Sequence, residues 1–178
     1  MDESKQGIGN SGAADASALF DRAMQGSAGS AIPAVMSATL SMRPDIYTAV
    51  MAAGKPILFE GALPVSVKQM MVMLIASRRD SRFCLDMYKA MLESMGIDKA
   101  LIDSCIDDPE MKLVPPMHRR LLYFALHAAQ DPNNVDDPRL QRLRDSGLNE
   151  EEILEAAMVA SFANFLVTWS NVRAPMEG

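Results

Sequence analysis

Apolar residues recur every three or four positions along most of this chain, and prolines and glycines divide the pattern into segments of helical length. This spacing gathers apolar side chains on one face of an α-helix. No alternating β-branched run is flanked by a hairpin turn, as a pair of strands would require. The pattern therefore predicts an all-α fold, with helices over 16–24, 33–42, 44–61, 64–79, 81–96, 97–108, 114–132, 136–147 and 149–172. The helix that begins at residue 44 either stops around Gly54 or continues to Gly61.

Two of these predicted helices carry the most structural information. Segment 64–79 is apolar nearly all round, which is typical of a helix buried on most faces. Segment 149–172 begins with Asn149 and Glu152, the spacing of a capping box. Its apolar front is too wide for a lone surface helix, so we expect it to be central or to be covered by another subunit.

The chain of 178 residues is long enough for one domain with a substantial core. Residues 1–14 are small, polar and rich in glycine, which predicts a disordered tail. Residues 15–178 then form a single helical domain.

Composition narrows the classes of function. The net charge of -6 argues against a nucleic-acid-binding protein and against docking on anionic lipid. The apolar run Met158–Trp169 contains Ser161, Asn164 and Thr168, so it predicts a buried helix rather than a membrane span. Two cysteines make no disulfide framework, and the first residues lack a basic start followed by an apolar run. We therefore expect a cytoplasmic protein with reduced thiols and no membrane partner.

Methionine is unusually frequent, with 15 residues. Methionine side chains fill irregular gaps and adapt to varied surfaces. The count favours a Met-rich core or subunit interface, and an apolar ligand pocket is the alternative.

The stretch DSRFCLDMY, residues 80–88, holds the main candidate for chemistry. With Asp80 as the N-cap of a helix, Cys84 lies in or just past the first turn, near unpaired backbone N–H groups. The helix dipole and nearby positive charges there favour a thiolate. These charges belong to Arg78, Arg79 and Arg82.

Two hydroxyl groups share the predicted helix face of Cys84. Ser81 lies three residues before it and Tyr88 four residues after it. Both hydroxyls could donate to a thiolate, which predicts a reactive cysteine of low pKa. The alternative is a structural cysteine that behaves as a small buried hydrophobic residue.

The block LPVSVKQMMVMLIASRRDSRFCLDMYKAMLESMG, residues 63–96, resembles the core motif of the carboxymuconolactone decarboxylase family, specifically its alkylhydroperoxidase AhpD-like branch. The later segments LLYFALHAAQDPNNV and LRDSGLNEEEILEAAMVASFANF are similar to the family's later helices. The resemblance spans about residues 40–172. It implies an AhpD-like helical bundle that assembles as a trimer or hexamer.

The resemblance also implies site residues, but this chain departs from the motif. The family pattern is Cys-x-x-Cys-x-x-x-His with an upstream glutamate. Ser81 replaces the first cysteine, Cys84 keeps the second, Tyr88 replaces the histidine, and Gln69 replaces the glutamate. A serine cannot resolve a mixed disulfide, and glutamine does not exchange protons near neutral pH. The usual two-cysteine cycle is therefore not expected within one site.

No metal or cofactor is expected. The two histidines, His118 and His127, point to opposite faces of one predicted helix and cannot share a metal ion there. Solvated or capping roles suit both. Cys105 lies on a separate predicted helix, and pairing with Cys84 would require Cα atoms within about 7 Å.

Three functions remain open. The first is a divergent alkylhydroperoxidase or peroxiredoxin-type antioxidant protein that uses at most the single thiol of Cys84. Ser81 and Tyr88 would polarise the thiolate or a small hydrophobic or peroxide substrate, and an external thiol would resolve the oxidised cysteine. The second is a non-redox decarboxylase or lactone-type enzyme that binds a small organic acid or lactone with Gln69, Tyr88 and nearby arginines. The third is a catalytically silent oligomer that binds a hydrophobic ligand.

Overall fold

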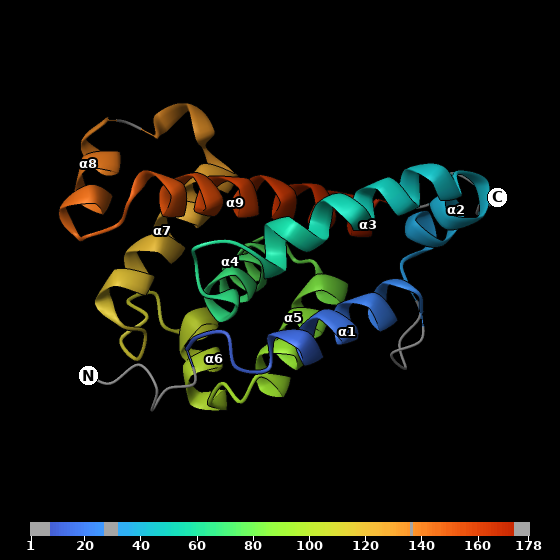
Figure 1. Ribbon diagram of the computed structural model, residues 1–178, viewed down its shortest axis with the longest axis horizontal. Helices are drawn as coiled ribbons and strands as arrows, with labels where there is room; N and C mark the ends of the chain where they lie inside the picture. Colours follow the sequence, from blue (N-terminus) through green and yellow to red (C-terminus); the bar gives the residue numbers. More distant parts are fainter. Residues whose placement is uncertain (1–7, 27–31, 136, 173–178) are drawn as a thin grey trace.

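The described part of the chain is helical throughout. The computed structural model describes residues 8–26, 32–135 and 137–172. In these ranges it contains no strand, which confirms the predicted all-α class (Figure 1). The elements are α1 (Ala13–Met24), α2 (Ala34–Met42), α3 (Pro44–Phe59), α4 (Val65–Arg78), α5 (Arg82–Ser94), α6 (Lys99–Asp107), α7 (Pro116–Gln130), the short 3₁₀ helix η2 (Pro132–Asn134), α8 (Asp137–Asp145) and α9 (Glu150–Asn171).

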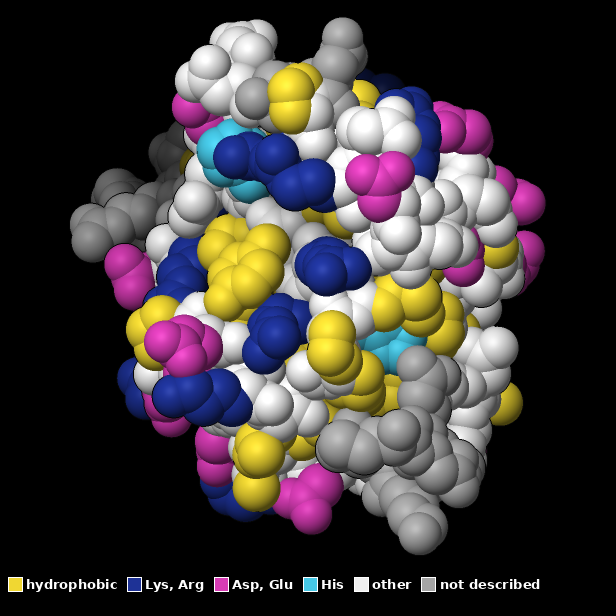
Figure 2. Space-filling model, turned by 90° about the vertical axis from the view of Figure 1, so that its left-hand side faces the viewer, with side chains coloured by type: hydrophobic (Ala, Val, Ile, Leu, Met, Phe, Trp, Pro, Cys, Tyr) yellow, Lys and Arg dark blue, Asp and Glu magenta, His cyan; other side chains and the backbone are white. Residues whose placement is uncertain are grey.

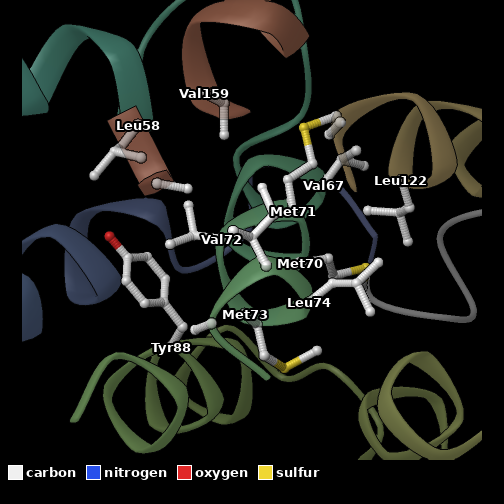
Figure 3. Packing of buried hydrophobic residues seen from close by; sticks show 14 of the residues in the cluster. Leu58, Val67, Met70, Met71, Val72, Met73, Leu74, Tyr88, Leu122 and Val159 are labelled. Carbon is white, nitrogen blue, oxygen red and sulfur yellow. The ribbon is translucent and has the colours of Figure 1, made fainter. Parts of the chain in front are cut away.

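Helix α4 forms the centre of the bundle. Every residue from Val65 to Ala76 is buried, as the all-round apolar pattern predicts. Its main neighbours are α5, α9 and α7. Figure 3 shows side chains leaving α4 in different directions, with Val72 on the side of Tyr88 and Leu74 on the side of Leu122. Burial of the whole helix explains why it carries no amphipathic stripe.

Helix α9 runs along the bundle and packs on α7 and α4 (Figure 1). The predicted capping box is present: Asn149 Oδ1 accepts from the Glu152 N–H, and the Glu152 carboxylate accepts from the Asn149 N–H. Among the described helices, only α9 is long and apolar enough to cross a membrane. Its inward face packs on other helices, as the core helix of a folded domain does.

The N-terminal segment differs from the prediction of a disordered tail over residues 1–14. Ile8 is buried, and α1 already begins at Ala13. Asn10 accepts a hydrogen bond from the Val65 N–H at 2.8 Å, and Ser66 Oγ accepts one from the Gly9 N–H at 2.8 Å. Asn10 therefore satisfies one of the free N–H groups at the start of α4, which Pro64 cannot do with its own side chain. Residues 1–7 lie outside the described residues.

Two local expectations are settled by packing. Helix α3 continues past Gly54 and through Pro56 to Phe59, the longer of the two predicted extents. His118 is buried at the start of α7, so the prediction of a solvated side chain there is wrong. His127 is partly exposed, and its Nε2 lies 3.3 Å from the Asn134 carbonyl oxygen.

Candidate functional site

Ser81, and not Asp80, is the N-cap of α5. Asp80 adopts a left-handed conformation with φ 53°, and the Ser81 N–H bonds to the Ala76 carbonyl at the end of α4. The tight reversal between α4 and α5 therefore uses Asp80 as its turning residue. Because the cap moves one position, Cys84 becomes the third residue of α5, still within its first turn.

Cys84 and Ser81 meet a third residue that the sequence did not indicate. Ser170, near the end of α9, lies with its Oγ 3.4 Å from Cys84 Sγ and 2.9 Å from Ser81 Oγ. Ser170 also donates to the Val167 carbonyl at 3.0 Å. Because the Ser170 hydroxyl proton is used in this way, the Ser170 oxygen accepts from the Ser81 hydroxyl and from the neutral Cys84 thiol. Ser170 belongs to no motif, and only the packing of α9 on α5 brings it here.

The thiol of Cys84 is fully buried, while Ser170 is partly exposed. Burial raises the pKa of Cys84, and the hydrogen bonds with Ser170 and Ser81 offset part of that rise. The prediction of a lowered pKa is therefore wrong, because loss of water outweighs the favourable position in the first helical turn.

Tyr88 is buried on the same helix, one turn beyond Cys84. Burial, with a smaller contribution from nearby Cys84, raises the pKa of Tyr88 well above its ordinary range. Its hydroxyl has no hydrogen-bond partner among the described residues. Figure 3 shows the ring reaching from α5 into the core, toward the side on which Leu58 lies. Tyr88 is therefore neutral at any physiological pH.

Gln69 is buried on α4 and is fixed by one hydrogen bond. Its Nε2 donates to the Leu58 carbonyl at 2.8 Å, and its Oε1 has no partner among the described residues. The set of Gln69, Ser81, Cys84 and Tyr88 therefore consists of neutral groups, two of which keep unused hydrogen-bonding capacity.

Cys105 lies apart on α6 as a free, buried thiol, and Cys84 is also free. Burial raises the pKa of Cys105 to about 12. A thiol of this kind behaves as a small apolar side chain.

A second polar cluster was missed by sequence reasoning. Lys68, with a side chain only 1% exposed, forms an ion pair of 2.7 Å with Glu155, whose side chain is 18% exposed. Lys68 also donates to the Glu60 carbonyl, and Glu155 accepts from the N–H groups of Ala62 and Leu63 at 2.6 and 3.0 Å. A lysine inside an otherwise apolar helix was the available signal, since a buried charge requires a partner.

Two solved structures share this fold. A peroxidase-related protein from Ralstonia eutropha JMP134, solved as an alkylhydroperoxidase AhpD core, matches with a TM-score of 0.70 at 22% identity, over 83% of this chain and 77% of its own. A peroxidase-related protein from Silicibacter sp. TM1040 matches with a TM-score of 0.69 at 18% identity, over 78% of this chain and 72% of its own. No protein-family model and no curated protein matches the sequence. The chain therefore has the AhpD-like helical fold.

Proposed function

We propose that this chain is a divergent peroxide-reducing protein of the alkylhydroperoxidase type that uses the single thiol of Cys84. The supporting observation concerns Cys84 in the first turn of α5. Its Sγ contacts Ser170 Oγ on α9, and Ser170 Oγ in turn contacts Ser81 Oγ. The peroxidase-related proteins that share the fold support the same class of reaction.

In the proposed reaction the thiolate of Cys84 attacks one oxygen of the hydroperoxide, and the O–O bond breaks. The sulfur is oxidised to a sulfenic acid. The alkoxide takes a proton from a serine hydroxyl and leaves as an alcohol, and water then returns a proton to the serine. Because Ser81 cannot resolve the oxidised thiol, an external small thiol forms a mixed disulfide with loss of water. A second external thiol then releases Cys84 and leaves as a disulfide.

Burial sets the rate of this reaction. Since the pKa of Cys84 is raised, only a small fraction of the thiol is ionised near neutral pH. Ser170 must turn from the Val167 carbonyl toward the sulfur to stabilise the thiolate. The protein is therefore expected to react slowly with peroxides, and faster as the pH rises.

One alternative has an observation in its favour. Full burial of Cys84 also suits a catalytically silent protein in which the thiol is part of the core. A decarboxylase or lactone-type enzyme would need a general base, whereas the hydrogen-bond partners of Cys84 are serine hydroxyls.

The test exposes the full chain briefly to cumene hydroperoxide with a sulfenic-acid trap and locates the label by mass spectrometry. We expect saturable labelling of Cys84 that rises about tenfold per pH unit between pH 7 and 9, because the thiolate is the reactive form. Ser170→Ala should slow the labelling, because it removes a hydroxyl that lowers the pKa of Cys84.

Cys105→Ser is the matched control and should label like the unmodified chain, whereas Cys84→Ser should not label. A Cys84 that stays unlabelled through pH 9 in the folded chain would contradict the peroxide-reducing function and favour the silent alternative.

A further inference from the structure

A cavity of about 380 Å³ lies between α7 and α8, away from the site of Cys84. It opens near the end of the molecule where α8 lies, whereas Ser170 is near the opposite end of α9 (Figure 1). Its volume falls in the range of sites that hold small ligands. No reaction proposed above uses this cavity.

Positive charge collects around the cavity although the chain as a whole is acidic. Arg120, Arg139 and Arg142 line it together with His127, and none of the described lining residues carries a carboxylate. The guanidinium groups of Arg120 and Arg142 form no ion pair with another described residue. Figure 2 shows Lys and Arg side chains gathered on this face around hydrophobic ones. Guanidinium groups in this state are suited to bind a carboxylate or phosphate through paired hydrogen bonds.

Apolar side chains form the rest of the wall. Phe124 on α7 and Leu143 on α8 line it and are buried, and Leu126 is half-buried. Tyr123 also lines the cavity, and its hydroxyl donates to the Pro109 carbonyl, which holds the ring in place. A ligand that fills this cavity therefore needs an apolar body as well as a negative charge. The small volume and the net charge of -6 disfavour an extended polyanion such as nucleic acid.

We propose that the cavity between α7 and α8 binds a small organic carboxylate. Its carboxylate pairs with Arg120 and Arg142, and its apolar chain or ring lies against Phe124 and Leu143. The site is independent of Cys84, so loss of peroxide chemistry in Cys84→Ser leaves binding unchanged.

The test measures binding to the full chain by isothermal titration calorimetry with octanoate, octyl phosphate and neutral octanamide. We expect octanoate to bind at least about tenfold more tightly than octanamide, since charge-assisted hydrogen bonds to arginine are the stronger ones. Raising the salt concentration should weaken octanoate binding at this partly exposed site. Equal binding of octanoate and octanamide would overturn the proposal. It would also be overturned if octyl phosphate bound more tightly than octanoate and inorganic phosphate bound without any apolar chain, because the site would then be a phosphate site.

Two substitutions localise the site. Arg120→Gln and Arg142→Gln each should weaken octanoate binding about tenfold or more, while octanamide binding stays the same. Both side chains are exposed, so the fold should survive, which circular dichroism checks. Arg22→Gln is the charge control: Arg22 lies on α1, is not among the residues that line the cavity, and its substitution should leave binding unchanged. Equal weakening by all three substitutions would show a general charge effect and overturn the assigned site.

Discussion

At the scale of single residues, two of the candidate site residues bury polar atoms without partners. Tyr88 Oη and Gln69 Oε1 are buried, and neither has a hydrogen-bond partner among the described residues. Such an atom loses its water without a replacement, which costs roughly 1–3 kcal/mol. These two atoms are retained at a cost in stability.

Tyr88→Phe should therefore raise the free energy of unfolding by about 1 kcal/mol, because it removes a desolvated hydroxyl and keeps the ring. Urea denaturation measures this change. Tyr47→Phe is the matched control: the Tyr47 hydroxyl donates to the Met24 carbonyl, so its loss should lower stability by a similar amount. A destabilised Tyr88→Phe protein would show that the hydroxyl has a partner, such as a bound water.

At the scale of elements, Glu155 connects α9 to two other segments. It forms an ion pair with Lys68 of α4 and accepts hydrogen bonds from the loop after α3. Gly61 in that loop has φ 106°, and a Cβ there would lie 2.1 Å from Glu155 Oε1. Only glycine therefore lets the loop approach the carboxylate. Partial burial by itself would raise the pKa of Glu155. The hydrogen bonds from Lys68, Ala62 and Leu63 together outweigh this effect, so the pKa of Glu155 is lowered overall.

Glu155→Gln should lower the free energy of unfolding by about 2–4 kcal/mol, because it leaves the buried Lys68 charge without its partner. Thermal and urea denaturation measure the loss. Glu150→Gln is the control: Glu150 pairs with Arg144 at the exposed surface, where water screens the charges, so its loss should change stability far less than the loss of Glu155. Similar losses in the two variants would contradict the role assigned to the buried pair.

At the scale of the whole molecule, α9 presents an apolar stripe on its outer face. Leu154, Met158 and Phe165 are exposed, and their spacings of four and seven residues match a heptad repeat. Such a stripe suits contact with another helix. We infer that the partner is the same stripe on a second copy, packed antiparallel.

Charge supports this choice of partner. Glu150 and Glu151 lie at the start of α9. Arg79 lies beside the C-terminal half of α9, where its guanidinium donates to Asn164 Oδ1 at 2.6 Å. In the proposed antiparallel pair, the acidic start of each α9 would lie toward the half of the other copy's α9 that carries Arg79. The proposed two-fold contact would build a dimer, or a hexamer when combined with a three-fold contact, rather than a simple trimer.

Sedimentation of the unmodified chain should therefore show a dimer or hexamer, and Phe165→Glu should shift it toward smaller species because it places a charge in the apolar contact. Leu113→Glu changes an exposed leucine outside α9 and should leave the assembly intact. A monomeric unmodified chain at about 100 μM, well above the Kd of a typical stable complex, would contradict self-association.

The sequence alone determined the helices, the burial of α4 and the capping box of α9. These features depend on residues a few positions apart, so periodicity, proline and glycine report them directly. The AhpD-like arrangement of segments was expected only from the resemblance of residues 63–96 and the later helices to that family. The sequence also brought Ser81, Cys84 and Tyr88 onto one helix, although it placed the N-cap at Asp80. Only the tertiary structure decided that Cys84 is buried, that Ser170 contacts it, and that Glu155 neutralises Lys68. Those contacts join α9 to segments distant in the chain, and long-range packing sets both the loss of water and the choice of partner.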